Sequence, residues 1–228
     1  MSAEPKAHVG HRARLRERFM RSPGSVPDYE LLEMFLYTVY PRIDTKPLAK
    51  SLMKKFATLG HLLYADKDHL RSVKGVSEIG ISNLVLVREI FERLMREDLK
   101  SQPIFKSAER VISYFRALMG NLNVERFVVL FLNKKGQLLE EEFLETGTLD
   151  RVAIYPREIV KKAVTIGATA AIMAHNHPSG VALPSDADKG ITSAVFDALR
   201  AVDVALMDHL IVTKESYFSF SGEGLLKP

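Results

Sequence analysis

Two histidines separated by one residue, His175 and His177, are the side chains of this sequence best placed to bind a metal ion. They follow the apolar run of residues 168–174, which is typical of a buried strand, and strand alternation places both imidazoles on the same face. Two neutral imidazoles can reach one cation at about 2.0–2.1 Å, and a carboxylate can supply a third ligand. The pair therefore predicts a metal site at the end of a strand.

Asp188 is the candidate carboxylate ligand. The turn-rich residues 178–184 lead to a predicted helix that begins after Ser185, and its apolar positions recur every three or four residues. Asp188 lies three residues before Ile191 and so faces inward from the first turn. A simpler role is also open, because Ser185-x-x-Asp188 is close to a capping box, in which Asp188 would accept a hydrogen bond from the backbone of Ser185. The spacing does not decide between the two roles.

These residues resemble a known signature. The pattern His175-x-His177, followed after seven residues by Ser185-x-x-Asp188, is similar to that of the JAMM (MPN-plus) zinc hydrolases. The longer stretch HNHPSG at 175–180, with YPRE at 155–158 before it and Asp208-His209 after it, resembles the bacterial RadC family in particular. This resemblance extends over nearly the whole chain.

The resemblance implies a zinc-dependent hydrolase with His175, His177 and Asp188 as metal ligands. Activated water would attack the amide carbonyl of a peptide or isopeptide bond, with Ser185 assisting the oxyanion. The same serine is well placed to be a helix N-cap instead. The substrate stays open, since a historical link of RadC proteins to DNA repair does not identify it.

Such a hydrolase also needs a general base near the water. By resemblance to the family pattern, the sequence favours Glu142 for this role. Its neighbours Glu140, Glu141 and Glu145 lie on the same predicted strand, and an error of one residue in register would exchange the two faces. Each of these glutamates could equally be an exposed strand carboxylate.

Three further residues near the motif have two readings each. Asn176 could bond to substrate or point to the face opposite the histidines. Asp208 and His209 could form a His–carboxylate pair that supports the metal site, although a histidine on a strand is expected to be structural rather than a fourth ligand.

The composition limits the chemistry and the compartment. The 228 residues include no cysteine, so disulfides and thiolate ligands are excluded and a zinc site must use histidine and carboxylate. No apolar run is long enough to span a membrane, and the N-terminus lacks the apolar core of a signal peptide. A cytoplasmic protein with no membrane partner is expected.

A basic segment near the N-terminus suggests a second function. The net charge is only +4, but Arg12, Arg14, Arg16 and Arg18 lie close together on a predicted helix. They could neutralise DNA phosphates. Alternatively, they form a solvated helix face or salt bridges with acids such as Glu30 and Glu33.

Residues 73–80 add to this second reading. The loop around Gly75 opens a helix N-terminus and resembles a helix-hairpin-helix element, whose backbone N–H groups can hold a phosphate. The second glycine usual in such hairpins is replaced here by Ser77. The alternative function is therefore a DNA-binding accessory protein whose metal site is structural or vestigial.

Hydrophobic periodicity predicts two domains of different class. Residues 1–97 form a small all-α domain, residues 98–106 a charged linker, and residues 107–228 a metal-binding domain. The second domain is expected to be α+β, with helices packed on a mixed, largely antiparallel sheet of the kind found in JAMM and cytidine deaminase proteins.

Overall fold

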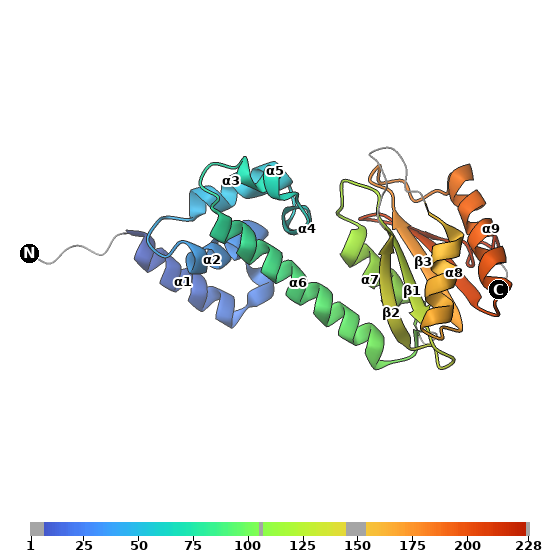
Figure 1. Cartoon of the computed structure of the whole chain (residues 1–228). Helices are drawn as coiled ribbons and strands as arrows, with labels where there is room; N and C mark the ends of the chain where they lie inside the picture. The colour runs from blue at the N-terminus through green and yellow to red at the C-terminus, as the bar shows by residue number, and fades with distance from the viewer. Residues whose placement is uncertain (1–6, 105–106, 145–153, 227–228) are drawn as a thin grey trace, which may run out of the picture. The chain divides into compact units, whose positions relative to one another are not determined.

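The computed structural model of the chain describes residues 7–104, 107–144 and 154–226 (Figure 1). The chain divides into two compact units, Met1–Ile90 and Phe91–Pro228, and the division falls inside helix α6 (Glu78–Ser101). The described part of the first unit is helical, and the second is α+β, as the sequence predicts. The linker expected at 98–106 begins inside a helix, because α6 continues to Ser101.

The helical unit contains α1 (Ala7–Arg21), a 3-10 turn (Pro23–Ser25), α2 (Asp28–Val39), α3 (Lys46–Phe56), α4 (Leu59–Leu63), α5 (Lys67–Arg71) and the first part of α6. Its core forms where the apolar faces of these helices meet, and it includes Leu36, Leu52 and Leu62. The sequence did not predict the short α4. This helix begins where the side chain of Thr58 accepts a hydrogen bond from the N–H of His61, at 3.2 Å.

The second unit contains a five-stranded sheet with the order β2-β1-β3-β4-β5. The strands are β1 (Phe127–Leu132), β2 (Leu138–Leu144), β3 (Ala170–Asn176), β4 (Ala205–Val212) and β5 (Tyr217–Ser219). All neighbouring pairs are antiparallel except β3 and β4, which are parallel. A parallel pair needs a long crossover, and α9 (Asp186–Arg200) provides it. The central strand β3 is buried along its whole length.

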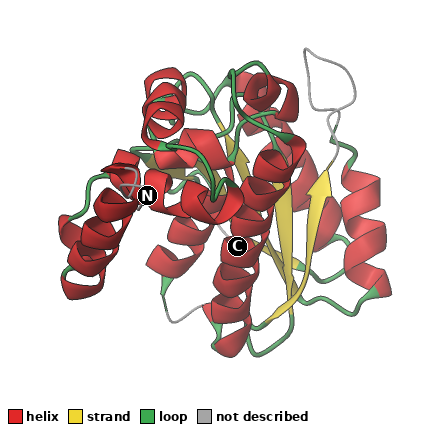
Figure 2. Cartoon of the chain, turned by 90° about the vertical axis from the view of Figure 1, so that its left-hand side faces the viewer, coloured by secondary structure: helices red, strands yellow, loops and turns green. Residues whose placement is uncertain are grey.

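Helices lie on both faces of this twisted sheet (Figures 1 and 2). Alternate residues of β1 separate the two cores, as strand alternation requires. Val128, Leu130 and Leu132 pack with α7 (Ala108–Met119), whereas Phe127, Val129 and Phe131 pack with α8 (Pro156–Thr165) and α9. His175 is paired with Phe127, so its side chain lies on the α8 and α9 face.

In the described part of the chain, no helix is both long enough and apolar enough to cross a membrane.

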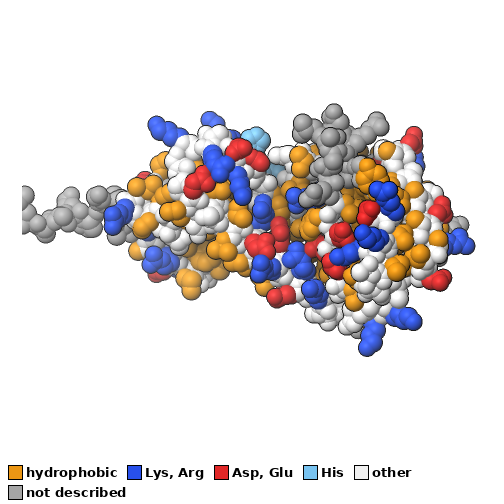
Figure 3. All heavy atoms as spheres, viewed as in Figure 1, with side chains coloured by type: hydrophobic (Ala, Val, Ile, Leu, Met, Phe, Trp, Pro, Cys, Tyr) orange, Lys and Arg blue, Asp and Glu red, His pale blue; other side chains and the backbone are white. Residues whose placement is uncertain are grey.

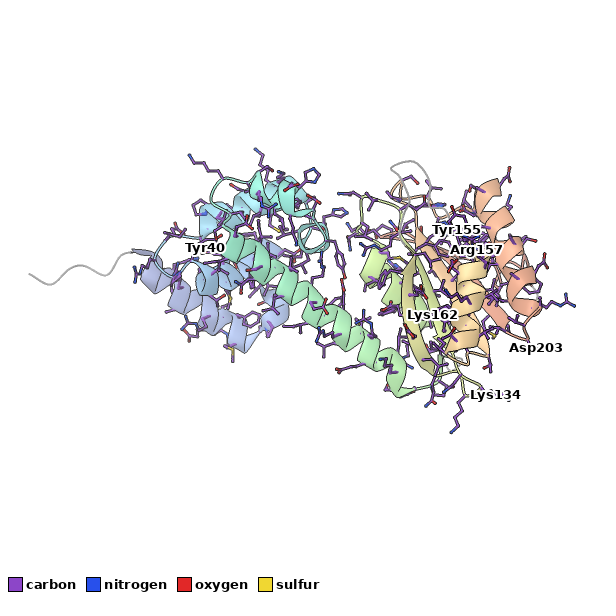
Figure 4. The ribbon with its side chains drawn as sticks, viewed as in Figure 1. Tyr40, Lys134, Tyr155, Arg157, Lys162 and Asp203 are labelled. Carbon is purple, nitrogen blue, oxygen red and sulfur yellow. The ribbon has the colours of Figure 1, made fainter. Side chains whose placement is uncertain are left out.

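Gly80 of α6 allows a testable prediction about the helical unit. The phenol oxygen of Tyr40, which is labelled in Figure 4, accepts the N–H of Ser77 at 2.8 Å, and a Cβ at Gly80 would overlap that oxygen. We expect Gly80→Ala to lower the free energy of unfolding by about 1–3 kcal/mol. Gly190→Ala is the control, because a Cβ at this helical position meets nothing within 4 Å. Urea denaturation measures both, and equal midpoints for the two variants would contradict the prediction.

Candidate metal centre

The site forms at the end of β3, where His175 is almost completely buried. The ring of Phe127, its partner on β1, stacks on the imidazole with a centroid distance of 5.5 Å and an interplanar angle of 6°. His177 follows just after the strand, and its Nε2 lies 3.0 Å from the Nε2 of His175. The expectation that both imidazoles share one face is therefore met.

The loop after β3 orients His177. Gly180 has a φ of +81°, a conformation that glycine adopts without strain. Its N–H donates to the carbonyl of His177 at 3.1 Å, which turns the chain back on itself. The carbonyl of Val181 then lies 2.8 Å from His177 Nδ1. If a cation binds at Nε2, the proton of His177 is on Nδ1 and is donated to this carbonyl.

Asp188 forms the capping box and also lies beside the histidines, so the cap does not exclude the role of metal ligand. Its Oδ2 accepts the backbone N–H of Ser185 at 2.7 Å, while Ser185 Oγ accepts the N–H of Asp188 at 3.2 Å, which completes a capping box at the start of α9. Its Oδ1 lies 3.2 Å from His175 Nε2. Its Oδ2, which caps the helix, also lies 3.5 Å from His177 Nε2, so one carboxylate contributes to the helix cap and faces both histidines.

The three side chains fit a metal ion. Ligand atoms at about 2.0–2.1 Å from a tetrahedral cation lie about 3.3 Å from one another. The two Nε2 atoms are 3.0 Å apart, and the oxygens of Asp188 lie 3.2 Å and 3.5 Å from them. The donors are nitrogen and oxygen, as the lack of cysteine requires. A cation held by these three groups would keep one coordination position open.

A fourth group, Glu125, completes the cluster, and no sequence motif indicated it. Among the described residues, Glu125, His175, His177 and Asp188 form a group whose ligand atoms all lie within 4.8 Å of one another. Glu125 Oε1 is 3.8 Å from His175 Nε2 and 3.9 Å from His177 Nε2, and its side chain is 44% exposed. These distances exceed the spacing of tetrahedral ligands, so Glu125 suits a group that contacts a water beside the cation.

The electrostatics of the site favour a charged carboxylate beside imidazole. Burial raises the pKa of Asp188, but hydrogen bonds from His175, His177 and Ser185 outweigh it and hold that pKa well below its usual range. The hydrogen bond with Asp188 in turn raises the pKa of His177. Asp188 is therefore an anion at neutral pH, as a metal ligand must be.

Comparison with known proteins identifies the domain that contains these four residues. Residues 105–225 match the RadC-like JAB domain. A UPF0758 protein from Rhodobacter capsulatus is 41% identical over 213 residues, which cover 93% of this chain and the whole of that protein. The chain belongs to the RadC family. The resemblance noted in the sequence is thereby confirmed.

In this RadC chain, Glu142 is not part of the four-residue group. It lies on β2 opposite Val129, and β1 separates β2 from the histidine strand. Its neighbour Glu140 pairs with Lys162 of α8, labelled in Figure 4, and Glu141 pairs with Arg96 at 2.8 Å on the other face. The expected alternation of faces is present, but among the described glutamates it is Glu125 that joins the histidines and Asp188 in the four-residue group. Glu145 lies outside the described residues.

A series of hydrogen bonds behind the ligands connects the RadC motif residues. His175 Nδ1 lies 2.9 Å from His209 Nε2, and His209 Nδ1 lies 2.6 Å from Thr192 Oγ1. The Thr192 hydroxyl donates to the carbonyl of Asp188 at 2.5 Å. If His175 binds a metal through Nε2, its proton is on Nδ1, and every donor in the series then has an acceptor. The series runs from the imidazole of His175 to the backbone of Asp188.

His209 supports the site, but Asp208 is not its carboxylate partner. His209 is fully buried, and burial holds the pKa of its imidazole well below the usual value, so it is neutral. Its ring stacks on Phe220 with a centroid distance of 4.8 Å. Asp208 accepts Ser219 Oγ at 2.6 Å and the N–H of Ser221 at 2.9 Å, because alternation along β4 turns it to the other face. The two residues therefore have separate roles.

The YPRE motif lies where α8 begins, with Pro156 in its first turn. The guanidinium of Arg157 lies over the ring of Tyr155, 5.2 Å from its centroid, and both residues are labelled in Figure 4. Tyr155 is 56% exposed. Both side chains are therefore at the surface of the domain.

The basic helix α1 uses several of its cations within the helical unit. Arg18 pairs with the buried Glu30, and His11 lies 3.0 Å from the buried Glu33. Arg12 donates to the carbonyl of Pro41 at 2.7 Å, beyond the C-terminal end of α2. Arg14 and Arg16 are exposed. The visible face of this unit mixes basic, acidic and hydrophobic side chains (Figure 3).

The hairpin at Gly75 is also engaged internally. Gly75 has a φ of +97°, as a tight turn with glycine allows. Ser77 caps α6, since its Oγ accepts the N–H of Gly80 at 3.2 Å. The N–H of Ser77, which would face a phosphate in a DNA-binding hairpin, donates to Tyr40 instead. Several of the groups that suggested DNA contact, including the N–H of Ser77, are therefore hydrogen-bonded or ion-paired within the helical unit.

The hydrogen bonds behind the ligands predict an effect on metal affinity. Thr192→Val keeps the shape of the side chain but removes the hydroxyl, so His209 loses the acceptor that fixes its ring. We expect the affinity for a divalent cation to fall about tenfold. Competition between the protein and a chelating dye for Zn²⁺ or Co²⁺ measures the change. Thr213→Val is the control, because that buried hydroxyl bonds to Ser216 instead. Unchanged affinity in Thr192→Val would contradict the prediction.

Proposed function

We propose that this RadC protein is a zinc-dependent hydrolase of amide bonds in peptides or isopeptides. The observation that carries the proposal is the four-residue group, with three donors at ligand spacing and one carboxylate about half an ångström farther out. Imidazole and carboxylate without thiolate suit a catalytic zinc site with one open position. The RadC-like JAB domain supports the same conclusion.

His175, His177 and Asp188 would hold the zinc. A bound zinc ion lowers the pKa of a coordinated water to about 7 and polarises a carbonyl oxygen. Glu125 is the group that we propose as general base, in place of Glu142. Its carboxylate lies on the open side of the three donors, where it can take a proton from the attacking water and deliver it to the leaving amine.

Ser185 would assist at the rim of the site. Its hydroxyl donates to Asp188 Oδ2 at 2.6 Å, and the residue is exposed. A substrate oxyanion beside the metal would compete with Asp188 for this proton. The N-cap role persists during this exchange, because the Ser185 oxygen still accepts the backbone N–H of Asp188.

Metal content and turnover test the proposal together. Purified wild-type protein should contain about one zinc per chain, and His175→Ala should contain none. Glu125→Gln should keep the zinc but lower kcat by about 10²–10⁴-fold, because it removes only the base. Elemental analysis gives the zinc content, and mass spectrometry of a peptide and isopeptide panel gives the turnover.

The matched control is Glu142→Gln, which removes the other candidate base from the same domain. We expect this variant to keep both zinc and turnover. Zinc-free wild-type protein would overturn the proposal. Loss of turnover in Glu142→Gln with normal turnover in Glu125→Gln would return the role of base to Glu142.

Zinc removal should also lower stability. A metal that binds only the folded chain stabilises it by RT ln(1 + [L]/Kd), which is about 2.7 kcal/mol at a hundredfold excess over Kd. Treatment with a chelator should therefore lower the unfolding temperature of wild-type protein, and added zinc should restore it. His177→Ala should show neither change in a thermal scan. A chelator effect of equal size in His177→Ala would place the stabilising metal elsewhere.

A further inference from the structure

Asn176, the residue between the two histidines, is buried and points away from them. It is 1% exposed, and both ends of its side-chain amide have partners on the neighbouring segment of the chain. Its Oδ1 accepts the backbone N–H of Arg126 at 2.8 Å, and its Nδ2 donates to the carbonyl of Val124 at 3.0 Å. These two backbone groups flank a single residue, which is Glu125.

This arrangement fixes the backbone on both sides of Glu125. The carbonyl of Val124 belongs to the peptide unit before Glu125, and the N–H of Arg126 belongs to the peptide unit after it. With both units held, the two backbone torsions of Glu125 are restricted, and so is the direction of its Cα–Cβ bond. The amide of Asn176 thus determines where the Glu125 side chain begins.

Glu125 needs such a restraint because the sheet does not provide one. Strand β1 begins at Phe127, and residues 123 and 124 form a bend before it. The backbone bond from the N–H of Asn176 to the carbonyl of Arg126 is long, at 3.4 Å. The side chain of Glu125 is also half exposed, so packing does not hold it. A general base must nevertheless be held within a few tenths of an ångström of its working position.

The chemistry of asparagine suits this position. The restraint needs one acceptor and one donor on a side chain that is one carbon long before its amide, and asparagine is the residue that provides both. Aspartate would keep the acceptor but oppose the carbonyl of Val124. Alanine would remove both bonds, so the carbonyl of Val124 and the N–H of Arg126 would each lose the partner that residue 176 provides. Of the two readings of Asn176, substrate contact or a side chain on the face opposite the histidines, its hydrogen-bonded amide favours the second.

We propose that Asn176 is a positioning residue that holds Glu125 at the open side of the metal centre by bonding the peptide groups before and after it. This inference rests on the proposed function of Glu125 as general base. In this proposal, three adjacent residues at the end of β3 have different roles. His175 and His177 bind the metal on one face, and Asn176 places the base from the other.

Asn176→Ala tests the proposal, because it removes both bonds and leaves the three metal ligands intact. We expect its zinc affinity to stay within about threefold of wild type, while kcat falls about 10²-fold. The double variant Asn176→Ala, Glu125→Gln should be no slower than Glu125→Gln alone, since both changes disable the same group. If Asn176→Ala lowers kcat by the same factor in the Glu125→Gln background as in the wild type, the two losses are additive and the proposal is overturned.

A second readout does not depend on turnover. Hydrogen exchange of the Arg126 amide, followed by NMR, should accelerate at least tenfold in Asn176→Ala, and a crystal structure of the zinc-loaded variant should show the Glu125 carboxylate displaced. An unchanged carboxylate position would overturn the proposal. If the wild type binds zinc but hydrolyses no amide, the proposed function fails while this readout still decides the role of Asn176.

Two further variants control for folding. Asn133→Ala removes three side-chain bonds at the other end of β1: Asn133 Oδ1 accepts the N–H groups of Lys135 and Gln137 at 2.9 Å and 3.1 Å, and its Nδ2 donates to Gln137 Oε1 at 3.1 Å. It should lose stability but keep kcat. Asn176→Asp preserves shape and one bond, so it should fold and show an intermediate loss of kcat. If Asn176→Asp and Asn176→Ala each have the same kcat as the wild type, the proposal is overturned.

Discussion

The structure of the site depends on one carboxylate that has two structural roles. Asp188 closes the first turn of α9 through Oδ2 and faces His175 through Oδ1. Because the helix begins where this cap forms, the position of α9 and the position of the carboxylate that faces the histidines are set together. A capping box stabilises a helix by roughly 0.5–2 kcal/mol. The same bonds also orient the carboxylate of Asp188 beside the histidines.

Other residues of the second unit orient the two histidines. His177 is held by the carbonyl of Val181, and His175 is held by His209, so in each case the nitrogen that remains is Nε2. Thr192 connects this arrangement back to the carbonyl of Asp188. The parallel pairing of β3 with β4 makes this possible, since it brings His209 beside the histidine strand with α9 as the crossover. A cation would therefore meet donors that are already oriented, which lowers the entropy cost of binding.

How much could be read from the sequence depended on the distance over which each signal acts. His175, His177 and Asp188 lie within one strand, one turn and one helix cap, where short periodicities give the direction of each side chain. The fold class followed from the same periodicities. Glu125 has no such local signal, because it lies in an irregular segment before β1. Only the antiparallel pairing of β1 with β3 brings Glu125 close to the histidines. A signal for it would have been an acidic residue next to a strand that pairs with the histidine strand.

The difference between local and long-range signals also explains why the general base was predicted on β2, which carries consecutive glutamates. Alternation correctly separates Glu140 from Glu141, but alternation does not report what lies opposite each face. Lys162 meets Glu140, while Arg96 and Tyr114 meet Glu141. A carboxylate paired with a cation is a weaker proton acceptor than one that faces water beside histidines. Glu125 has the second environment, and the strand that supplies the ligands also supplies, through Asn176, the means to hold it there.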